Sequence, residues 1–310
     1  MKYYQFKTFV TSYFFPKVNE DTDFLYFLYG NYGGWQAKLY WWLFRKCWIV
    51  RHINSVDSSE IEDFDLINKL VGEDAIFAIN YGTPNQEQKK SILGIDTKKD
   101  MKFFAKFAVK KDAMALTKNE IYVYDILSGT GLVPMTYKTV IETEYVFLKC
   151  EYLQGKHIHN DIPKDAIMSI LAKMRMRHYQ ETDKWSHFHH LETSLAHCDF
   201  CLWNMIETEN GIRLIDWELA QERPLGFDLF TYVFLGNYAQ NHNLTNEMIW
   251  NQYQDLVEDY FKSADIKDWL PYLNAFVDIK LAWQKGRSDQ FYYGKLMSLR
   301  EFANKEINEK

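Results

Sequence analysis

The sequence predicts an α+β protein of two lobes, in which a five-stranded antiparallel sheet with one helix precedes a mainly helical C-terminal lobe. Five short segments rich in β-branched and aromatic residues follow one another between residues 75 and 152, and apolar residues recur at helical spacing after residue 160. Strands that are grouped before helices are typical of the α+β class. The 310 residues, 47% of them hydrophobic, suffice for one compact unit of two lobes.

Each of the five predicted strands is a short apolar run bounded by turn residues. A turn at residues 82–86 separates the first two, and the third carries Lys106 in its apolar middle. The fifth runs into a glycine turn at residues 153–155. The predicted strands cover residues 75–81, 90–95, 102–109, 135–141 and 145–152.

One helix is predicted among the strands and four after them, from apolar residues that share a helical face. The first spans residues 112–128 and has Glu120 near its middle. Pro163 lies in the first turn of the next, where a missing N–H costs little, and Thr245 is the expected N-cap of the one after that. The C-terminal helices are predicted over residues 161–178, 245–260, 269–283 and 288–302.

Three polar residues of the C-terminal half have the spacing of a phosphoryl-transfer site. Asp199 follows His197 and Cys198, Asn204 comes five residues after Asp199, and Asp216 comes twelve residues after Asn204. Such a site needs a base that orients the acceptor hydroxyl and divalent cations that absorb the charge of the transferred group. We expect Asp199 to be the base, and we expect Asn204 and Asp216 to supply the hard oxygen ligands that Mg²⁺ prefers.

This ordered set resembles the aminoglycoside phosphotransferase and choline kinase family, the small-molecule branch of the protein-kinase-like fold. The resemblance rests on His197-x-Asp199, on Asn204 and on Ile215-Asp216-Trp217, and it covers residues 75–235. Protein kinases fit less well, because an arginine is missing before Asp199 and no Ala-Pro-Glu segment follows Asp216. The resemblance implies a two-lobed protein-kinase-like fold that uses ATP and Mg²⁺.

The resemblance also implies a nucleotide site in the N-terminal lobe. Lys106 would pair with Glu120 and direct its ammonium group at the α- and β-phosphates. A lysine inside an apolar strand is costly unless it meets an anion, which favours this pairing. In the family the exit strand is the hinge whose backbone holds the adenine, and Glu151 and Tyr152 are the nearest positions here.

The turn at residues 82–86 would lie over the nucleotide phosphates, with Gly82, Thr83 and Asn85 as the candidate contacts. It departs from a glycine-rich loop, because Gly82 is its only glycine and Pro84 removes a backbone donor. A plain hairpin turn is therefore an open alternative for this segment.

The resemblance also assigns a structural residue. The aspartate of Pro224-Leu225-Gly226-Phe227-Asp228 matches a family residue that braces the catalytic loop, so we expect a structural role for Asp228.

On this resemblance we expect an ATP-dependent phosphotransferase that acts on a hydroxyl group of a small molecule. The acceptor could be an aminoglycoside, a choline-like or amino alcohol, or a sugar, including a lipid-linked or polysaccharide sugar at a membrane surface. The alternative from another class is a catalytically inactive nucleotide-binding or scaffold protein. We expect an N-terminal aromatic-rich extension over 1–70, a nucleotide-binding lobe over 71–153, and a lobe for the catalytic loop and the acceptor over 154–310.

Residues 35–52 are densely aromatic, with Lys38, Arg45 and His52 at seven-residue spacing on a narrow polar stripe. The apolar runs are much shorter than the roughly 20 residues that a spanning helix requires. Two interpretations remain. A basic, tryptophan-rich helix can lie in a membrane interface, and a helix with a broad apolar face can pack on the N-terminal lobe or on a partner chain.

Composition argues against nucleic acid as a partner and against a secreted domain. The net charge is −6, whereas proteins that bind nucleic acid present basic surfaces. The four cysteines form no disulfide spacing framework, and we find no signal peptide. We expect a cytoplasmic protein, peripheral at the inner membrane face if residues 35–52 bind lipid. The sequence indicates no oligomeric state.

A zinc site is not expected. Cys198-x-x-Cys201 has metal spacing, but a structural zinc ion requires two more ligands at matching spacing. His187, His189 and His190 are not grouped with carboxylates or cysteines that would complete such a site. We expect these histidines to be loop or helix-end residues.

Overall fold

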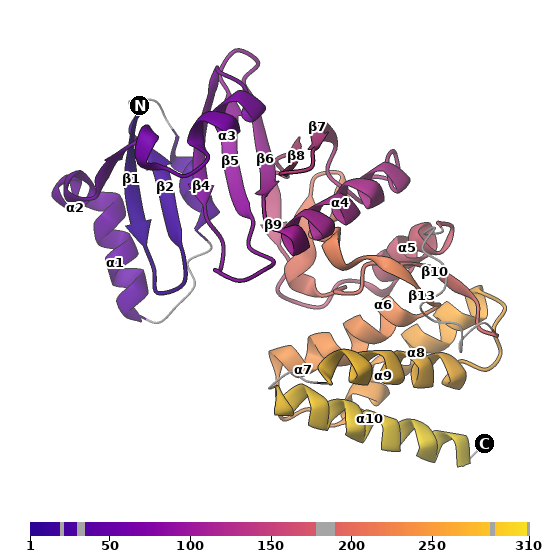
Figure 1. Cartoon of the computed structure of the whole chain (residues 1–310). Coiled ribbons are helices and arrows are strands. Elements are labelled where there is room, and N and C mark those ends of the chain that lie inside the picture. The colour runs from indigo at the N-terminus through magenta and orange to yellow at the C-terminus, as the bar shows by residue number, and fades with distance from the viewer. Residues whose placement is uncertain (19–21, 30–34, 178–189, 286–288, 309–310) are drawn as a thin grey trace. The chain divides into compact units, whose positions relative to one another are not determined.

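The computed structural model describes residues 1–18, 22–29, 35–177, 190–285 and 289–308. It divides into two compact units, which comprise Met1–Tyr124 with Pro134–Leu153, and Asp125–Val133 with Gln154–Lys310. The predicted α+β class is confirmed, because the first unit is an antiparallel sheet with helices and the second is mainly helical (Figure 1). The expectations for His187 and His189 lie outside the described residues.

The sheet of the first unit has eight strands among the described residues, in the order β3-β1-β2-β4-β5-β6-β8-β7. The prediction of five strands is wrong in number, because residues 2–57 add three strands to the five that lie where we expected them. All neighbouring strands are antiparallel. The strands are β1 (Lys2–Lys7), β2 (Ser12–Pro16), β3 (Ser55–Asp57), β4 (Ala75–Asn80), β5 (Lys90–Asp96), β6 (Met101–Ala108), β7 (Thr136–Ile141) and β8 (Val146–Glu151).

Helices cover both faces of this sheet. Successive residues of a strand point to opposite sides, so neighbouring residues of β4 pack against different helices. Phe77 and Ile79 of β4 pack in a cluster with helix α3 (Phe64–Val71). Ala78, between them, belongs to a second cluster, which includes residues of α1 (Trp35–Lys46) and of the 3₁₀ helix η1 (Asp23–Leu28). The N-terminal segment is therefore part of the folded sheet unit (Figure 1).

Residues 35–52 do not form a single helix. Helix α1 ends at Lys46, Cys47 is extended with φ −99° and ψ 109°, and α2 (Trp48–Ile53) begins after it. The prediction of one helix with a continuous polar stripe is thus wrong. Trp41 and Phe44 are buried against the sheet, so the packing interpretation holds for this face of α1.

Helix α4 (Lys111–Ile126) begins soon after β6 and agrees with the helix predicted over 112–128. Lys106 lies on β6 between Ala105 and Phe107, which both belong to the cluster around α3. Because side chains alternate along a strand, Lys106 points to the other face of the sheet.

The second unit places short strands around the predicted catalytic motifs. Strand β10 (Thr193–Ala196) pairs with β13 (Gln221–Pro224), and β11 (Met205–Thr208) pairs with β9 (Gly155–His157) and β12 (Gly211–Leu214). The segment His197–Asn204 therefore connects two short sheets. Its last three residues form the 3₁₀ turn η4 (Leu202–Asn204), and η5 (Trp217–Leu219) follows β12.

The helices after residue 160 lie close to their predicted positions. Helix α5 begins one residue after Pro163, which is its N-cap. The Thr245 hydroxyl accepts the N–H of Met248 at 3.2 Å, which confirms the predicted cap. The helices of the second unit are α5 (Lys164–Arg175), α6 (Phe227–Phe230), the π-helical η6 (Thr231–Gly236), α7 (Asn237–Gln240), α8 (Asn246–Ser263), α9 (Leu270–Gln284) and α10 (Gln290–Asn308). Within the described ranges, no helix is both long and apolar enough to cross a membrane.

The two neighbouring tryptophans of α1 give a matched test of this packing. Trp41 is 7% exposed and Trp42 is 57% exposed. We expect Trp41→Ala to lower the free energy of unfolding by about 3–5 kcal/mol, because it leaves a cavity between α1 and the sheet. Trp42→Ala should change it by at most about 0.5 kcal/mol. Denaturant unfolding measures both, and equal losses would contradict the burial of one face only.

Candidate active site

The structure brings Asp199 and Asn204 into direct contact at the start of β11. The Nδ2 group of Asn204 donates to Oδ2 of Asp199 at 2.8 Å and to the Asp199 backbone oxygen at 2.9 Å. Both oxygens of Asp199 are acceptors, so the amide nitrogen of Asn204 must face them. The other atom of the amide, Oδ1 of Asn204, is then the one suited to bind a cation.

A second donor orients the same carboxylate. The indole Nε1 of Trp203 donates to Oδ2 of Asp199 at 3.3 Å, and Trp203 itself is 45% exposed. Asp199 is half-buried. A carboxylate that is oriented by two N–H donors and still accessible is suited to accept a proton from a bound hydroxyl.

His197 connects Asp199 to the chain segment that carries Asp216. The Asp199 N–H donates to Nδ1 of His197 at 3.3 Å, so this ring nitrogen is the acceptor, and the proton of the neutral ring is on Nε2. Nε2 then donates to the backbone oxygen of Ile215 at 2.9 Å. The buried ring also packs on Trp217, with 4.5 Å between centroids. His197 is therefore a structural link between the two predicted motifs.

The carboxylate of Asp228 holds the start of the loop. Its Oδ2 accepts the N–H of His197 at 2.6 Å, and its Oδ1 accepts the N–H of Cys198 at 2.9 Å. Asp228 lies in the first turn of α6 and is 4% exposed. Burial raises the pKa of this carboxyl group, and the two backbone donors partly oppose that rise.

Lys280 is a residue of this site that sequence reasoning missed. Its Nζ donates to the backbone oxygen of Cys198 at 2.9 Å, and it is 7% exposed on the apolar helix α9. Burial lowers the pKa of this ammonium group, while nearby acidic groups, including Asp228 and Asp199, raise it. The only signal in the sequence is a lysine within the mainly apolar segment of residues 275–283, which also contains Asp278.

Asp228 and Lys280 together fix a strained peptide. Cys198 has a φ of 70°, which is left-handed backbone that residues other than glycine rarely adopt. Its N–H is held by Asp228 and its carbonyl by Lys280, so both ends of the residue before Asp199 are restrained. Such conformations persist where the surroundings over-determine them, and they concentrate at functional sites.

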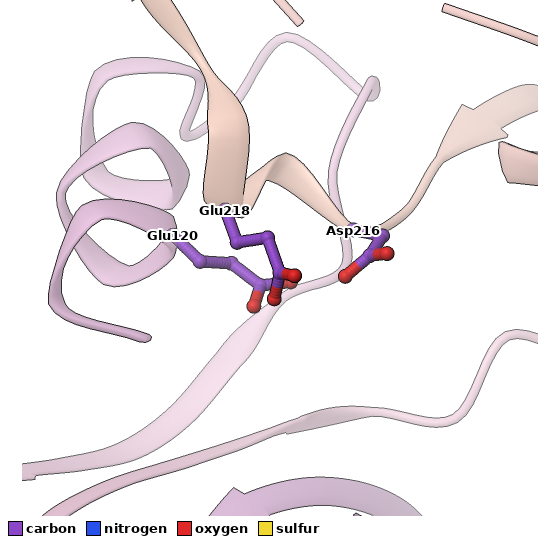
Figure 2. Close-up of side chains that lie close together, drawn as sticks. All are labelled: Glu120, Asp216 and Glu218. Atoms are coloured by element: carbon purple, nitrogen blue, oxygen red, sulfur yellow. The ribbon is translucent and has the colours of Figure 1, made fainter. Parts of the chain in front are cut away.

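Asp216 follows β12 and is also left-handed, with a φ of 66°. Figure 2 shows its carboxylate together with that of Glu218, and an oxygen of each lies within 4.8 Å of the other. Glu218 is a further residue of this site that the sequence analysis did not predict. Carboxylate and amide oxygens are the ligands that Mg²⁺ prefers, so the oxygens of Asp216, Glu218 and Asn204 fit this cation chemically.

In the first unit, the structure brings Lys106 and Glu120 together as predicted. Lys106 Nζ lies 2.6 Å from Oε2 of Glu120, and their side chains are 9% and 1% exposed. Tyr124, one turn further along α4, donates to the other oxygen of Glu120 at 3.3 Å. A buried lysine with a fixed carboxylate partner keeps its charge in one position, which a phosphate-binding ammonium group requires.

The turn after β4 has Gly82 at its start. Gly82 has a φ of 71°, and a Cβ there would lie 2.6 Å from the Lys89 carbonyl oxygen. Its N–H donates to the Asn80 side chain at 2.9 Å, and the Asn85 carbonyl accepts from Lys110 Nζ at 2.7 Å. These contacts account for the glycine as a turn residue, and a phosphate contact from Gly82 or Thr83 stays a prediction.

At the predicted hinge, Glu151 is the last residue of β8. Its N–H donates to the Met135 carbonyl at 2.8 Å, and its carboxylate accepts the Met135 N–H at 3.1 Å. Tyr152 follows the strand and packs near Phe24. Adenine recognition by the backbone at Glu151 or Tyr152 stays a prediction.

No protein-family model matches this sequence, and no curated protein matches it significantly. Among solved structures it is similar to the amicoumacin kinase hAmiN in complex with AMP-PNP, Ca²⁺ and Ami, at 10% identity and a TM-score of 0.49, over 80% of this chain and 95% of that one. It is also similar to an aminoglycoside phosphotransferase in a ternary complex with ADP and hygromycin B, at 12% identity and a TM-score of 0.48, over 78% and 98% of the chains. A third is an ethanolamine kinase from Plasmodium vivax, at 13% identity and a TM-score of 0.45, over 93% and 95%. These proteins are of the class that the sequence motifs resemble.

Proposed function

We propose that this protein is an ATP- and Mg²⁺-dependent phosphotransferase that phosphorylates a hydroxyl group of a small molecule. The observation that carries the proposal is the connected network of the second unit. In it, Asn204 orients the carboxylate of Asp199, and His197 joins that loop to the segment of Asp216. Phosphoryl transfer requires an oriented base and ligands for a divalent cation, and this network contains candidates for both.

In the proposed reaction, the acceptor hydroxyl oxygen forms a bond to the γ-phosphorus of ATP, and the bond from that phosphorus to the ADP oxygen breaks. The hydroxyl proton passes to the carboxylate of Asp199. Asn204 and Trp203 keep this carboxylate oriented while it changes charge. When bound, Mg²⁺ neutralises the charge of the phosphates, and Asn204, Asp216 and Glu218 are the residues that would hold it.

The buried ion pair of the first unit supports the nucleotide part of the proposal. Lys106 would direct its ammonium group at the α- and β-phosphates, with Glu120 as its fixed partner. We propose weaker contributions from Gly82 and Thr83 to the phosphates, and from the backbone at Glu151 and Tyr152 to the adenine. A reaction that consumes ATP also agrees with a cytoplasmic location.

A transfer screen tests the proposal and the nature of the acceptor. Full-length protein is incubated with γ-labelled ATP, Mg²⁺ and sets of aminoglycosides, amino alcohols and sugars, and label in the acceptor is measured. Transfer to at least one set is expected. If the protein binds ATP but transfers label to none of them, and also does not hydrolyse ATP, the inactive nucleotide-binding alternative is favoured.

Asp199→Asn should lower turnover by about 10²–10⁴-fold, because the amide cannot accept the acceptor proton. ATP affinity should stay nearly unchanged, because Asp199 acts on the acceptor. Steady-state kinetics measure the loss of turnover, and calorimetry measures the ATP affinity. The same exchange at Asp255, which is exposed on α8, is the matched control. Turnover of Asp199→Asn within twofold of wild type would remove Asp199 from the mechanism.

Asp216→Ala and Lys106→Ala should both weaken binding of Mg-ATP and leave adenosine affinity nearly unchanged, because both residues are proposed to act on the phosphates and their cation. Calorimetry with ATP and with adenosine distinguishes binding of the phosphates from binding of the nucleoside. Wild-type Mg-ATP affinity in both variants would contradict the proposed site.

Lys106→Ala also leaves the buried carboxylate of Glu120 without its partner, which is strongly destabilising. The double variant Lys106→Met with Glu120→Gln removes both charges and is expected to restore the melting temperature without restoring Mg-ATP affinity. Restored affinity would mean that Lys106 acts only through stability.

Lys280→Met should reduce turnover and leave the KM for ATP nearly unchanged, because the Cys198 carbonyl loses its donor and Asp199 loses its fixed position. Hydrogen bonds to charged groups contribute about 1.5–3 kcal/mol, which corresponds to a turnover loss of roughly ten- to a hundredfold. Thermal unfolding and steady-state kinetics give the two readouts. Lys262→Met, at an exposed position of α8, is the control. A loss of stability with unchanged turnover would show that Lys280 only supports the fold.

A further inference from the structure

Helix α1 has a second apolar face, directed away from the sheet. Trp35, Leu39, Trp42 and Leu43 are 73%, 49%, 57% and 36% exposed. Residues in a helix advance by about 100° each, so positions 35, 39, 42 and 43 form one continuous stripe. By the same helical angle, this stripe lies opposite Trp41 and Phe44, which pack on the sheet. We call these four residues the outer stripe.

Helix α2, the next element, also carries exposed apolar residues: Ile49 and Ile53 are 50% and 76% exposed and lie one turn apart. Single exposed apolar residues are ordinary on protein surfaces, whereas contiguous groups of large ones mark interaction sites. Two of the four residues of the outer stripe are tryptophans, the residue type most enriched with tyrosine at membrane–water interfaces.

The charge of this segment is opposite to that of the whole protein. Residues 35–53 contain two lysines and two arginines and no acidic residue, although the chain has a net charge of −6. Arg45 lies 3.7 Å from Asp23 and over the Tyr26 ring, and the guanidinium group of Arg51 lies over Tyr4. The two lysines, Lys38 and Lys46, are exposed.

These lysines belong to the same surface as the outer stripe. By the helical angle, Lys46 falls within the stripe at its C-terminal end, and Lys38 falls at its edge, one turn before Trp42. Lysine at such positions can lay its apolar stem along the stripe and direct its ammonium group outward. The cores of protein–protein interfaces are depleted in lysine, so this pattern disfavours a partner chain.

We propose that the outer face of α1, with the outer stripe and Lys38 and Lys46, binds the surface of a membrane that contains anionic lipid. The tryptophan and leucine side chains would lie at the boundary of headgroups and acyl chains, and the lysines would contact lipid phosphates. A helix of twelve residues is about 18 Å long, so it would lie in the plane of the interface. An otherwise acidic protein would need such a basic patch to approach an anionic surface.

This inference does not depend on the proposed phosphoryl transfer. If both hold, the enzyme would meet acceptor hydroxyls that are carried by lipids or by lipid-linked sugars, and this consequence rests on the proposed function. Vesicle binding is measured without substrate, so it can fail or succeed independently of activity.

The test is cosedimentation of the full-length protein with vesicles of equal parts phosphatidylglycerol and phosphatidylcholine, and with vesicles of phosphatidylcholine alone. Wild-type protein should pellet with the anionic vesicles at low salt and bind the neutral ones less. Binding should weaken as salt rises, because the Debye length falls from about 10 Å at 0.1 M to about 3 Å at 1 M. Wild-type protein that stays in the supernatant at low salt would overturn the proposal.

Variants of the two faces separate membrane binding from folding. Trp35→Glu with Trp42→Glu should abolish pelleting and leave the cooperative melt unchanged, and Lys38→Glu with Lys46→Glu should lower the partition coefficient by at least about tenfold. Ile141→Glu and Met248→Glu, at exposed apolar positions of β7 and α8, are the controls and should bind as wild type does.

Two outcomes would contradict the assignment. Full binding by the Trp35→Glu with Trp42→Glu variant would mean that another surface holds the vesicles. A wild-type dimer in light scattering that the same variant converts to a monomer, with no vesicle binding by either, would show that the outer stripe is an interface between copies of this chain.

Discussion

The buried carboxylate of Asp228 is the constraint on which the candidate active site depends. A buried charge must be satisfied by donors, and here the donors are two consecutive backbone N–H groups, those of His197 and Cys198. That arrangement coincides with the left-handed backbone of Cys198, whose carbonyl accepts from Lys280. The position of Asp199, the next residue, thus depends on two charged side chains from helices that follow it in sequence. Gly226 permits this geometry, because its φ is 78° and a Cβ would lie 2.5 Å from the Phe261 ring.

Local sequence patterns predicted the strands from β4 to β8 and placed Asp199 and Asn204 in one motif, because both rest on residues close together in the chain. The hydrogen bonds between Asp199 and Asn204 became apparent only in the structure. The pairing of Lys106 with Glu120 was implied by the family resemblance, and the cost of a lysine in the middle of an apolar strand favoured it. Lys280 was not predicted, because its partner lies 82 residues away and a lysine in a mainly apolar helix does not identify the group that it contacts. The first strands were missed for a different reason. In β1 the buried residues are Tyr3 and Phe6, three apart, so the strand lacks the two-residue alternation by which strands are recognised.

Helix α1 illustrates why aromatic density alone could not decide between a core helix and an interfacial one. Trp41 and Trp42 are adjacent in sequence, yet one is in the sheet cluster and the other faces outward. A helix with apolar residues on two opposite sides has little amphipathic contrast, so periodicity identifies neither side as the buried one. Only the packing partners, such as Phe6 and Phe15 of the first two strands, determine which side is internal.

The place of β2 in the sheet has a consequence for how this chain can be divided. Strand β2 pairs with β4 through Tyr13 with Asn80 and Phe14 with Ile79. A fragment that begins at residue 71 would lack β1–β3 and nearly all of α3, and β4 would become an open edge with unpaired N–H and carbonyl groups. Open, apolar edges template the addition of strands from other chains. Such a fragment would keep every residue of the candidate active site and yet tend to assemble edge to edge. The N-terminal segment therefore protects the chain from aggregation by covering the edge of β4.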